Sequence, residues 1–69
     1  MEMGAVERVL VVAMCRKCWS VEETAQESGV AVQTVQSMLR GEKVSLKTFG
    51  LVCHALETDP DDMLVRGEE

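Results

Sequence analysis

The stretch Ser20–Arg40, SVEETAQESGVAVQTVQSMLR, decides how this chain folds. Ser20 is followed three residues later by Glu23, which is the spacing of a capping box: each side chain can bond the exposed backbone N–H of the other residue. A helix is therefore predicted to begin here. It should end at Ser28-Gly29, because glycine adopts the left-handed backbone of a tight turn without strain.

A second helix is predicted directly after this turn, from about Val32 to Arg40, with Gly41 as its stop. Its buried face is marked by apolar residues at i, i+3 and i+4, namely Val35, Met38 and Leu39. Its other face is polar and rich in amides: Gln33, Thr34, Gln36, Ser37 and Arg40. Two short helices joined by a glycine turn, the second with a polar outer face, are typical of a helix-turn-helix.

The same features extend along the chain in a fixed order: Ala25, Gly29-Val30, Val35, Arg40-Gly41, and the segment VSLKTFGLVCHALETDPDDML at 44–64. Together they resemble the phage-repressor, or Cro/cI-type, helix-turn-helix family over roughly residues 6–65. The resemblance implies an all-α fold, a compact five-helix, lambda-repressor-like helix-turn-helix domain. We expect a single domain over residues 1–69, with its helix-turn-helix core at about 20–40.

Periodicity predicts the remaining helices. The first should run from about Ala5 to Lys17 after a frayed Met1–Gly4, with a core stripe of Val6, Val9, Leu10, Ala13 and Met14. Ser45 should cap another, whose apolar residues keep the helical period: Leu46, Phe49, Val52, Cys53 and Leu56. Asp59 should cap a last short helix with Pro60 at its first position, where a missing N–H costs nothing. Met63, Leu64 and Val65 are then expected to close the core or an interface, and Arg66–Glu69 to form a tail.

A second apolar stripe lies on the 5–17 helix and just beyond it, formed by Val11, Cys15 and Cys18 at i, i+4 and i+7. Two interpretations stay open. The stripe could bury itself against a partner, or the C-terminal tail could cover it.

The formal net charge is −5, which is unusual for a nucleic-acid-binding protein. The charge is unevenly distributed, however. Residues 16–47 carry five basic and four acidic side chains, whereas the rest of the chain carries two basic and eight acidic ones. Because salt screens charges beyond about 8–10 Å, a local basic rim can still attract phosphate, although with modest affinity.

The three cysteines raise the possibilities of disulfides and of a zinc site, and the sequence supports neither. Their odd number without a secretory signal favours free thiols in a cytoplasmic protein over disulfides, and no apolar run is long enough to span a membrane. Cys15 and Cys18 with Cys53 and His54 could supply four zinc ligands. Structural zinc sites usually place such a pair on a turn, however, whereas Cys15 and Cys18 lie inside or at the end of a predicted helix. Cys53 and His54 would point about 100° apart if helical. We therefore predict no metal and no cofactor. No constellation of catalytic residues is visible either, so an enzyme is not expected.

The predicted function follows from the polar face of the 32–40 helix. The resemblance implies base-reading positions at Val32, Gln33, Gln36 and Ser37, and phosphate contacts at Arg40, Lys43 and Lys47; Thr34 completes the candidate DNA-binding set. Glutamine can offer a donor and an acceptor together to adenine in the major groove. We therefore expect a sequence-specific, repressor-like transcription regulator that binds double-stranded DNA as a homodimer.

One alternative belongs to another class. The acidic charge, together with valines at positions 21 and 32 where the family usually has polar residues, would also suit a protein-interaction module. Such a module could be an antirepressor or modulator that binds a partner regulator protein.

Overall fold

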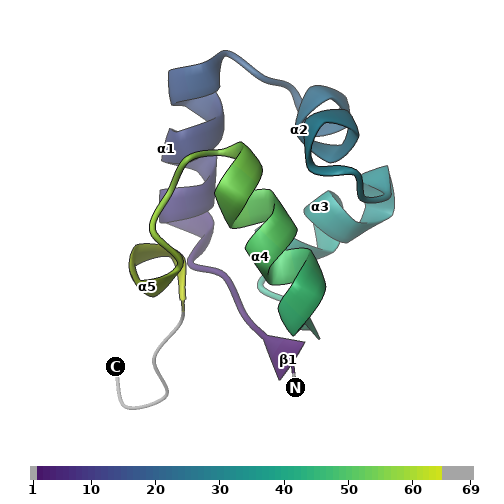
Figure 1. The fold of residues 1–69 in the computed structure, drawn as a ribbon, viewed down its shortest axis with the longest axis vertical. Coiled ribbons are helices and arrows are strands. Elements are labelled where there is room, and N and C mark those ends of the chain that lie inside the picture. Colours follow the sequence, from purple (N-terminus) through teal and green to yellow (C-terminus); the bar gives the residue numbers. More distant parts are fainter. Residues whose placement is uncertain (1, 65–69) are drawn as a thin grey trace.

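In the computed structural model, which describes residues 2–64, five helices form the bulk of the molecule (Figure 1). The elements follow one another in the order β1 (Glu2–Met3), α1 (Glu7–Lys17), α2 (Val21–Ser28), α3 (Val32–Leu39), β2 (Val44–Ser45), α4 (Leu46–Ala55) and α5 (Pro60–Met63). The predicted helical fold class is confirmed, with a small two-stranded sheet in addition. Figure 1 shows α1 upright on one side, α2 and α3 on the other, and α4 crossing between them.

The helix-turn-helix forms as its sequence predicts. Ser20 Oγ accepts a hydrogen bond from the Glu23 N–H at 3.2 Å, and the Glu23 carboxylate accepts one from the Ser20 N–H at 2.9 Å, which completes the capping box. Gly29 ends α2 with φ at 75°. Thr24 is fully buried, and its hydroxyl donates to the Ser20 carbonyl at 2.9 Å, so this polar side chain is satisfied inside the core.

The prediction of a frayed N-terminus is wrong for the described residues 2–4. Strand β1 pairs antiparallel with β2, with Glu2 opposite Ser45 and Met3 opposite Val44. Ala5 then bridges to Leu64, and the first helix begins at Glu7 rather than Ala5. The reason is that the ladder satisfies backbone groups through segments about 40 and 60 residues away, which local periodicity cannot detect.

The core is shared by all five helices, and its largest fully buried side chains include Phe49, Leu10, Met38, Met63 and Val35. Met63 therefore closes the core, which was one of the two predicted roles for this segment. Val65 and the expected tail Arg66–Glu69 lie outside the described residues. Leu46 belongs to α4 and keeps its helical period as predicted, but unlike Phe49 and Val52 it is not buried, since 55% of the residue is exposed. Leu46 is the first residue of α4, at the edge of that helix's buried face.

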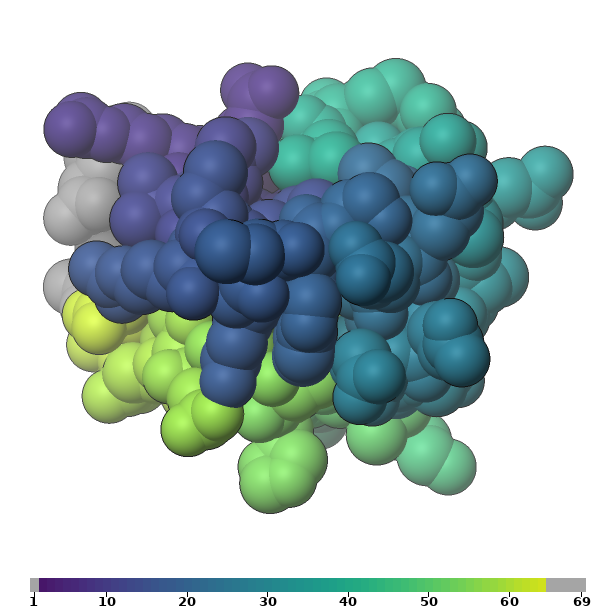
Figure 2. Space-filling view, turned by 90° about the horizontal axis from the view of Figure 1, so that it is seen from above, coloured from purple at the N-terminus to yellow at the C-terminus, as the bar shows by residue number. Residues whose placement is uncertain are grey.

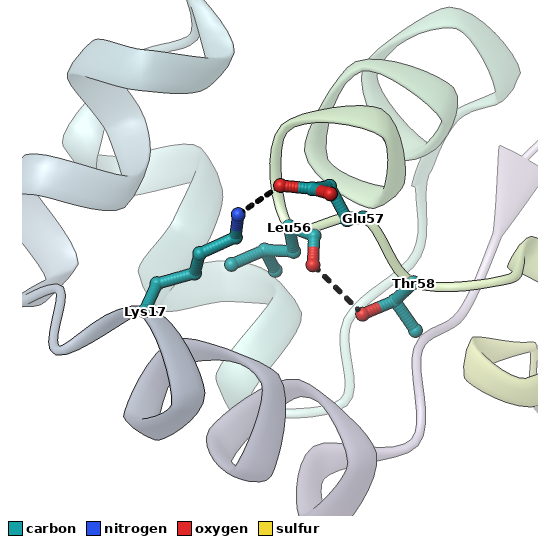
Figure 3. A network of polar contacts seen from close by, with 4 residues as sticks. All are labelled: Lys17, Leu56, Glu57 and Thr58. Carbon is teal, nitrogen blue, oxygen red and sulfur yellow. Dashed lines mark hydrogen bonds and ion pairs between the residues drawn. The ribbon is translucent and has the colours of Figure 1, made fainter.

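A polar contact joins the end of α1 to the turn after α4 (Figure 3). Lys17 forms an ion pair with Glu57, and its ammonium also lies 5.5 Å from the centre of the Trp19 ring. The hydrogen bond and charge of Lys17 hold the pKa of the Glu57 carboxyl below its ordinary value of 4.5. The Thr58 hydroxyl donates to the Leu56 carbonyl at 3.3 Å in the same turn. These contacts lie at the end of α1, and none of them involves α3.

Candidate nucleic-acid interface

The outer face of α3 carries the predicted base-reading side chains. Gln33 and Gln36 are exposed, and Val32 is 37% exposed at the start of the helix. At about 100° per residue, the side chains of Val32, Gln36, Arg40, Gln33 and Ser37 fall within an arc of about 140° on the helix surface. The predicted residues from Val32 to Arg40 therefore share one face, except for Thr34, which lies on its flank. Thr34 and Ser37 are both half-buried.

The opposite face of α3 fixes this orientation. Val35 and Met38 are both completely buried, and α3 contacts α2, α1 and β2. A rotation of the helix that hid the glutamines would bring these two apolar side chains into water, at a cost of roughly 1.5–3 kcal/mol for each one. The polar face is therefore held outward by the core.

Arg40 is engaged within the protein. Its Nε donates to a Glu42 carboxylate oxygen at 3.1 Å, and its Nη2 donates to Ser37 Oγ at 3.2 Å. Hydrogen bonds from Arg40 and Ser37, together with the Arg40 charge, hold the pKa of the Glu42 carboxyl below its ordinary value of 4.5. Two predicted DNA contacts, Arg40 and Ser37, are thus tied to an acidic residue that sequence reasoning did not single out. The sequence did contain a signal for this contact, because Glu42 stands two residues after Arg40, directly after Gly41.

Two lysines remain available beside α3. Lys43 and Lys47 are exposed, and neither forms an ion pair with any residue in the described range. Lys47 lies in the first turn of α4, whose N-terminus is capped by Ser45 Oγ accepting from the Thr48 N–H at 3.3 Å. The positive end of the helix dipole adds to the lysine charge there, which suits a phosphate. Glu2 is an opposing influence that the sequence did not suggest, because β1 places it opposite Ser45.

The valines behind the alternative function are not equivalent. Val32 is partly exposed on the face of α3, whereas Val21 is half-buried and packs against the core. Of these two valines, Val32 is therefore the one that offers exposed apolar surface to a partner. Ala31 precedes α3 without any side-chain cap, consistent with the absence of a hydroxyl or carboxylate at that position.

The cysteines do not gather at one place. Cys15 and Cys18 are exposed, whereas Cys53 is buried in α4, and burial together with the nearby Asp59 charge raises the pKa of its thiol to about 11. Within residues 2–64, no three His, Cys, Asp or Glu side chains are grouped so that they could hold a metal ion.

A family model described as helix-turn-helix matches residues 14–63, which include α2, α3 and α4 in full. The chain therefore belongs to the phage-repressor-like helix-turn-helix family, and its class is that of DNA-binding helix-turn-helix regulators, which are typically not enzymes. Searches of curated proteins and of solved structures gave no significant match. None of the described helices is long and apolar enough to cross a membrane.

Proposed function

We propose that this protein is a sequence-specific, repressor-like transcription regulator of the cytoplasm that inserts α3 into the major groove of double-stranded DNA. The observation that carries the proposal is that two kinds of exposed side chain follow one another along the chain. Gln33 and Gln36 are exposed where a base edge could be read. Lys43 and Lys47, which form no ion pair with another residue of the 2–64 range, follow in the next segment.

We further propose that the protein binds DNA as a homodimer, with two α3 helices reading half-sites about 34–36 Å apart. Val11 and Cys15 support this, because both are exposed on the same side of α1 and Val11 is 42% exposed. The Met63–Val65 end was the other predicted contact, but Met63 is fully buried in the monomer and Val65 lies outside the described residues. Sedimentation should therefore show a dimer at micromolar concentration that a Val11→Glu variant dissociates; a wild-type monomer at high micromolar concentration would contradict this contact.

The experiment that tests base reading is selection from random double-stranded DNA, followed by titration of the selected site. We expect Gln33→Ala to cost about 1–3 kcal/mol on the preferred site and to relax the choice at one base pair. Lys43→Ala is the matched comparison: it should weaken all sequences alike and reduce the salt slope by about 0.9 per monomer. If no sequence is enriched even at low salt, sequence-specific binding is refuted.

The second candidate is a protein-interaction module that acts on a partner regulator. It is favoured by the net charge of −5 and by the exposure of Val32, which would form the apolar centre of a docking face. The selection experiment separates the two functions. In this second case DNA selection fails, and Val32→Asp abolishes capture of the partner without changing the fold.

A further inference from the structure

A groove of about 510 Å³ lies between α1 and the α4–α5 segment. One wall is α1, and the opposite wall is formed by Thr58 and Asp62. Figure 2 shows α1 and the turn after it (dark blue) beside the α4–α5 segment (yellow-green), with α2 and α3 (teal) on the other side. No residue of α3 lines the groove, so a DNA-reading α3 leaves it unused.

The floor of the groove is apolar and only partly covered. Val12 is 42% exposed, Val6 and Val9 are half-buried, and Ala13 is buried beneath them. A valine this exposed on a helix face indicates an open trough rather than an enclosed ligand pocket, because small-molecule sites bury most of their ligand. An amphipathic helix needs such a trough, since it buries only one face.

The two ends of this floor are positively charged. Arg8 and Arg16 both line the groove and are both exposed, and they are eight residues, or about 12 Å, apart along α1. Neither arginine forms an ion pair with a residue in the 2–64 range, and Asp62 is the single acid in the lining. The groove therefore keeps a net positive charge in a protein whose total charge is −5.

We propose that this groove binds a short amphipathic helix of a partner protein, one that presents apolar side chains between two acidic residues about two turns apart. Acids at i and i+7 or i+8 span about 10–12 Å on the same side of a helix, which matches the separation of the arginines. Apolar residues between them would cover Val12 and its neighbours. The proposal does not rest on DNA binding; where both hold, the protein carries its partner to a DNA site.

A second copy of the chain fits this groove poorly. Antiparallel pairing of two α1 helices about Val12 would place Arg8 of each copy against Arg16 of the other, which is repulsive. The acidic outer face of α2 has charges of the right sign, but none of the large apolar residues that are exposed in the described part of the chain lies in α2. The charge pattern thus points to a different acidic protein rather than to self-association.

The test uses two fluorescein-labelled helical peptides of about 16 residues, with leucines between two glutamates spaced seven or eight apart, and matched peptides with lysine replacing both glutamates. Binding to the full chain is followed by anisotropy, and the contact surface is mapped by NMR shifts. The groove variant is Arg8→Glu with Arg16→Glu. Its matched control is Lys43→Glu with Lys47→Glu, which makes the same change in charge beside α3. Circular dichroism checks that both variants fold, as expected for exposed residues.

We expect at least one glutamate peptide to bind saturably and to shift resonances of α1 and α5. The groove variant should bind that peptide about tenfold more weakly and should prefer the lysine peptide, while the control variant keeps wild-type affinity. Three results would overturn the proposal: no saturable binding of either glutamate peptide, equal losses in the two variants, or a dimer that only the groove variant dissociates. DNA binding is measured on the same proteins, so that a failure of the proposed DNA binding can be told apart from a failure of peptide binding in the groove.

Discussion

The contact between Glu42 and Arg40 makes a quantitative prediction about DNA affinity. In the free protein the Arg40 guanidinium donates to the Glu42 carboxylate at 3.1 Å, so this acid would compete with a DNA phosphate for Arg40. Glu42→Gln removes that anion and frees one cation in each monomer. Because the pKa of Glu42 is held below 4.5, the carboxylate is ionised throughout the neutral range, and the effect should be constant between about pH 5.5 and 8.

The magnitude follows from counterion release. One additional cation in contact with phosphate steepens the plot of log affinity against log salt by about 0.9 per monomer. Between 200 and 50 mM salt, a fourfold change, this amounts to about 3.5-fold per monomer and about 12-fold for a dimer on two half-sites. The ratio of wild-type Kd to variant Kd should therefore increase by that factor as salt is lowered across this range.

The control is Glu57→Gln, which removes the same charge from a similar exposed ion pair, with Lys17, in the turn after α4. Neither Glu57 nor Lys17 belongs to the proposed DNA-binding set, so this change should leave the slope almost unchanged. The assay is fluorescence anisotropy on a selected DNA site at four salt concentrations, with Arg40→Ala measured alone and combined with Glu42→Gln. Equal slopes for the two glutamine variants, or a full Glu42 effect in the absence of Arg40, would refute the reasoning.

Three further predictions concern the fold and the thiols. Gly50→Ala should stabilise the protein by about 0.5–1 kcal/mol in thermal unfolding, because Gly50 is exposed within α4 and an added Cβ meets nothing within 4 Å; an unchanged or lower Tm would contradict this. Val35→Asp should cost about 4 kcal/mol or more, since it buries an unpaired charge at a completely buried position; a variant with wild-type stability by circular dichroism would show α3 to be misplaced. At pH 7.5, iodoacetamide should label Cys15 and Cys18 in the native protein but Cys53 only after unfolding, because burial raises the pKa of that thiol to about 11; mass spectrometry showing three rapid additions would disprove this.

The features that sequence predicted well are those set by residues a few positions apart. The capping box of Ser20 and Glu23, the left-handed Gly29 and the Asp59-Pro60 start of α5 all depend on chemistry within one turn of helix. Asp59 accepts from the Asp61 N–H at 2.9 Å, as a cap should. Such signals are independent of the rest of the fold, and they place the exposed amide face of α3 correctly.

The features that sequence missed depend on distant segments. Two residues are too few to show strand periodicity, so the pairing of Glu2–Met3 with Val44–Ser45 could not be foreseen. Leu46 matches the helical period of α4 but lies at its first position, where the core no longer extends. The pairing of Arg40 with Glu42 depends on which rotamers these exposed side chains adopt, and the sequence does not determine the rotamers.

The distribution of the described cations explains how an acidic protein could act on DNA. The six basic residues within 2–64 fall into three pairs. Lys17 and Arg40 each form an ion pair with an acid. Lys43 and Lys47, which follow α3, and Arg8 and Arg16, which line the groove, form no ion pair with a described residue. With two such lysines per monomer on the proposed DNA surface, non-specific affinity should be low and its salt slope shallow. A DNA-bound partner docked in the groove would offset this weakness, because a tethered second site raises the effective concentration of the first. If both proposals hold, the low DNA affinity expected of α3 and the positive charge of the groove would be two parts of one arrangement, in which occupancy of a DNA site depends on the partner.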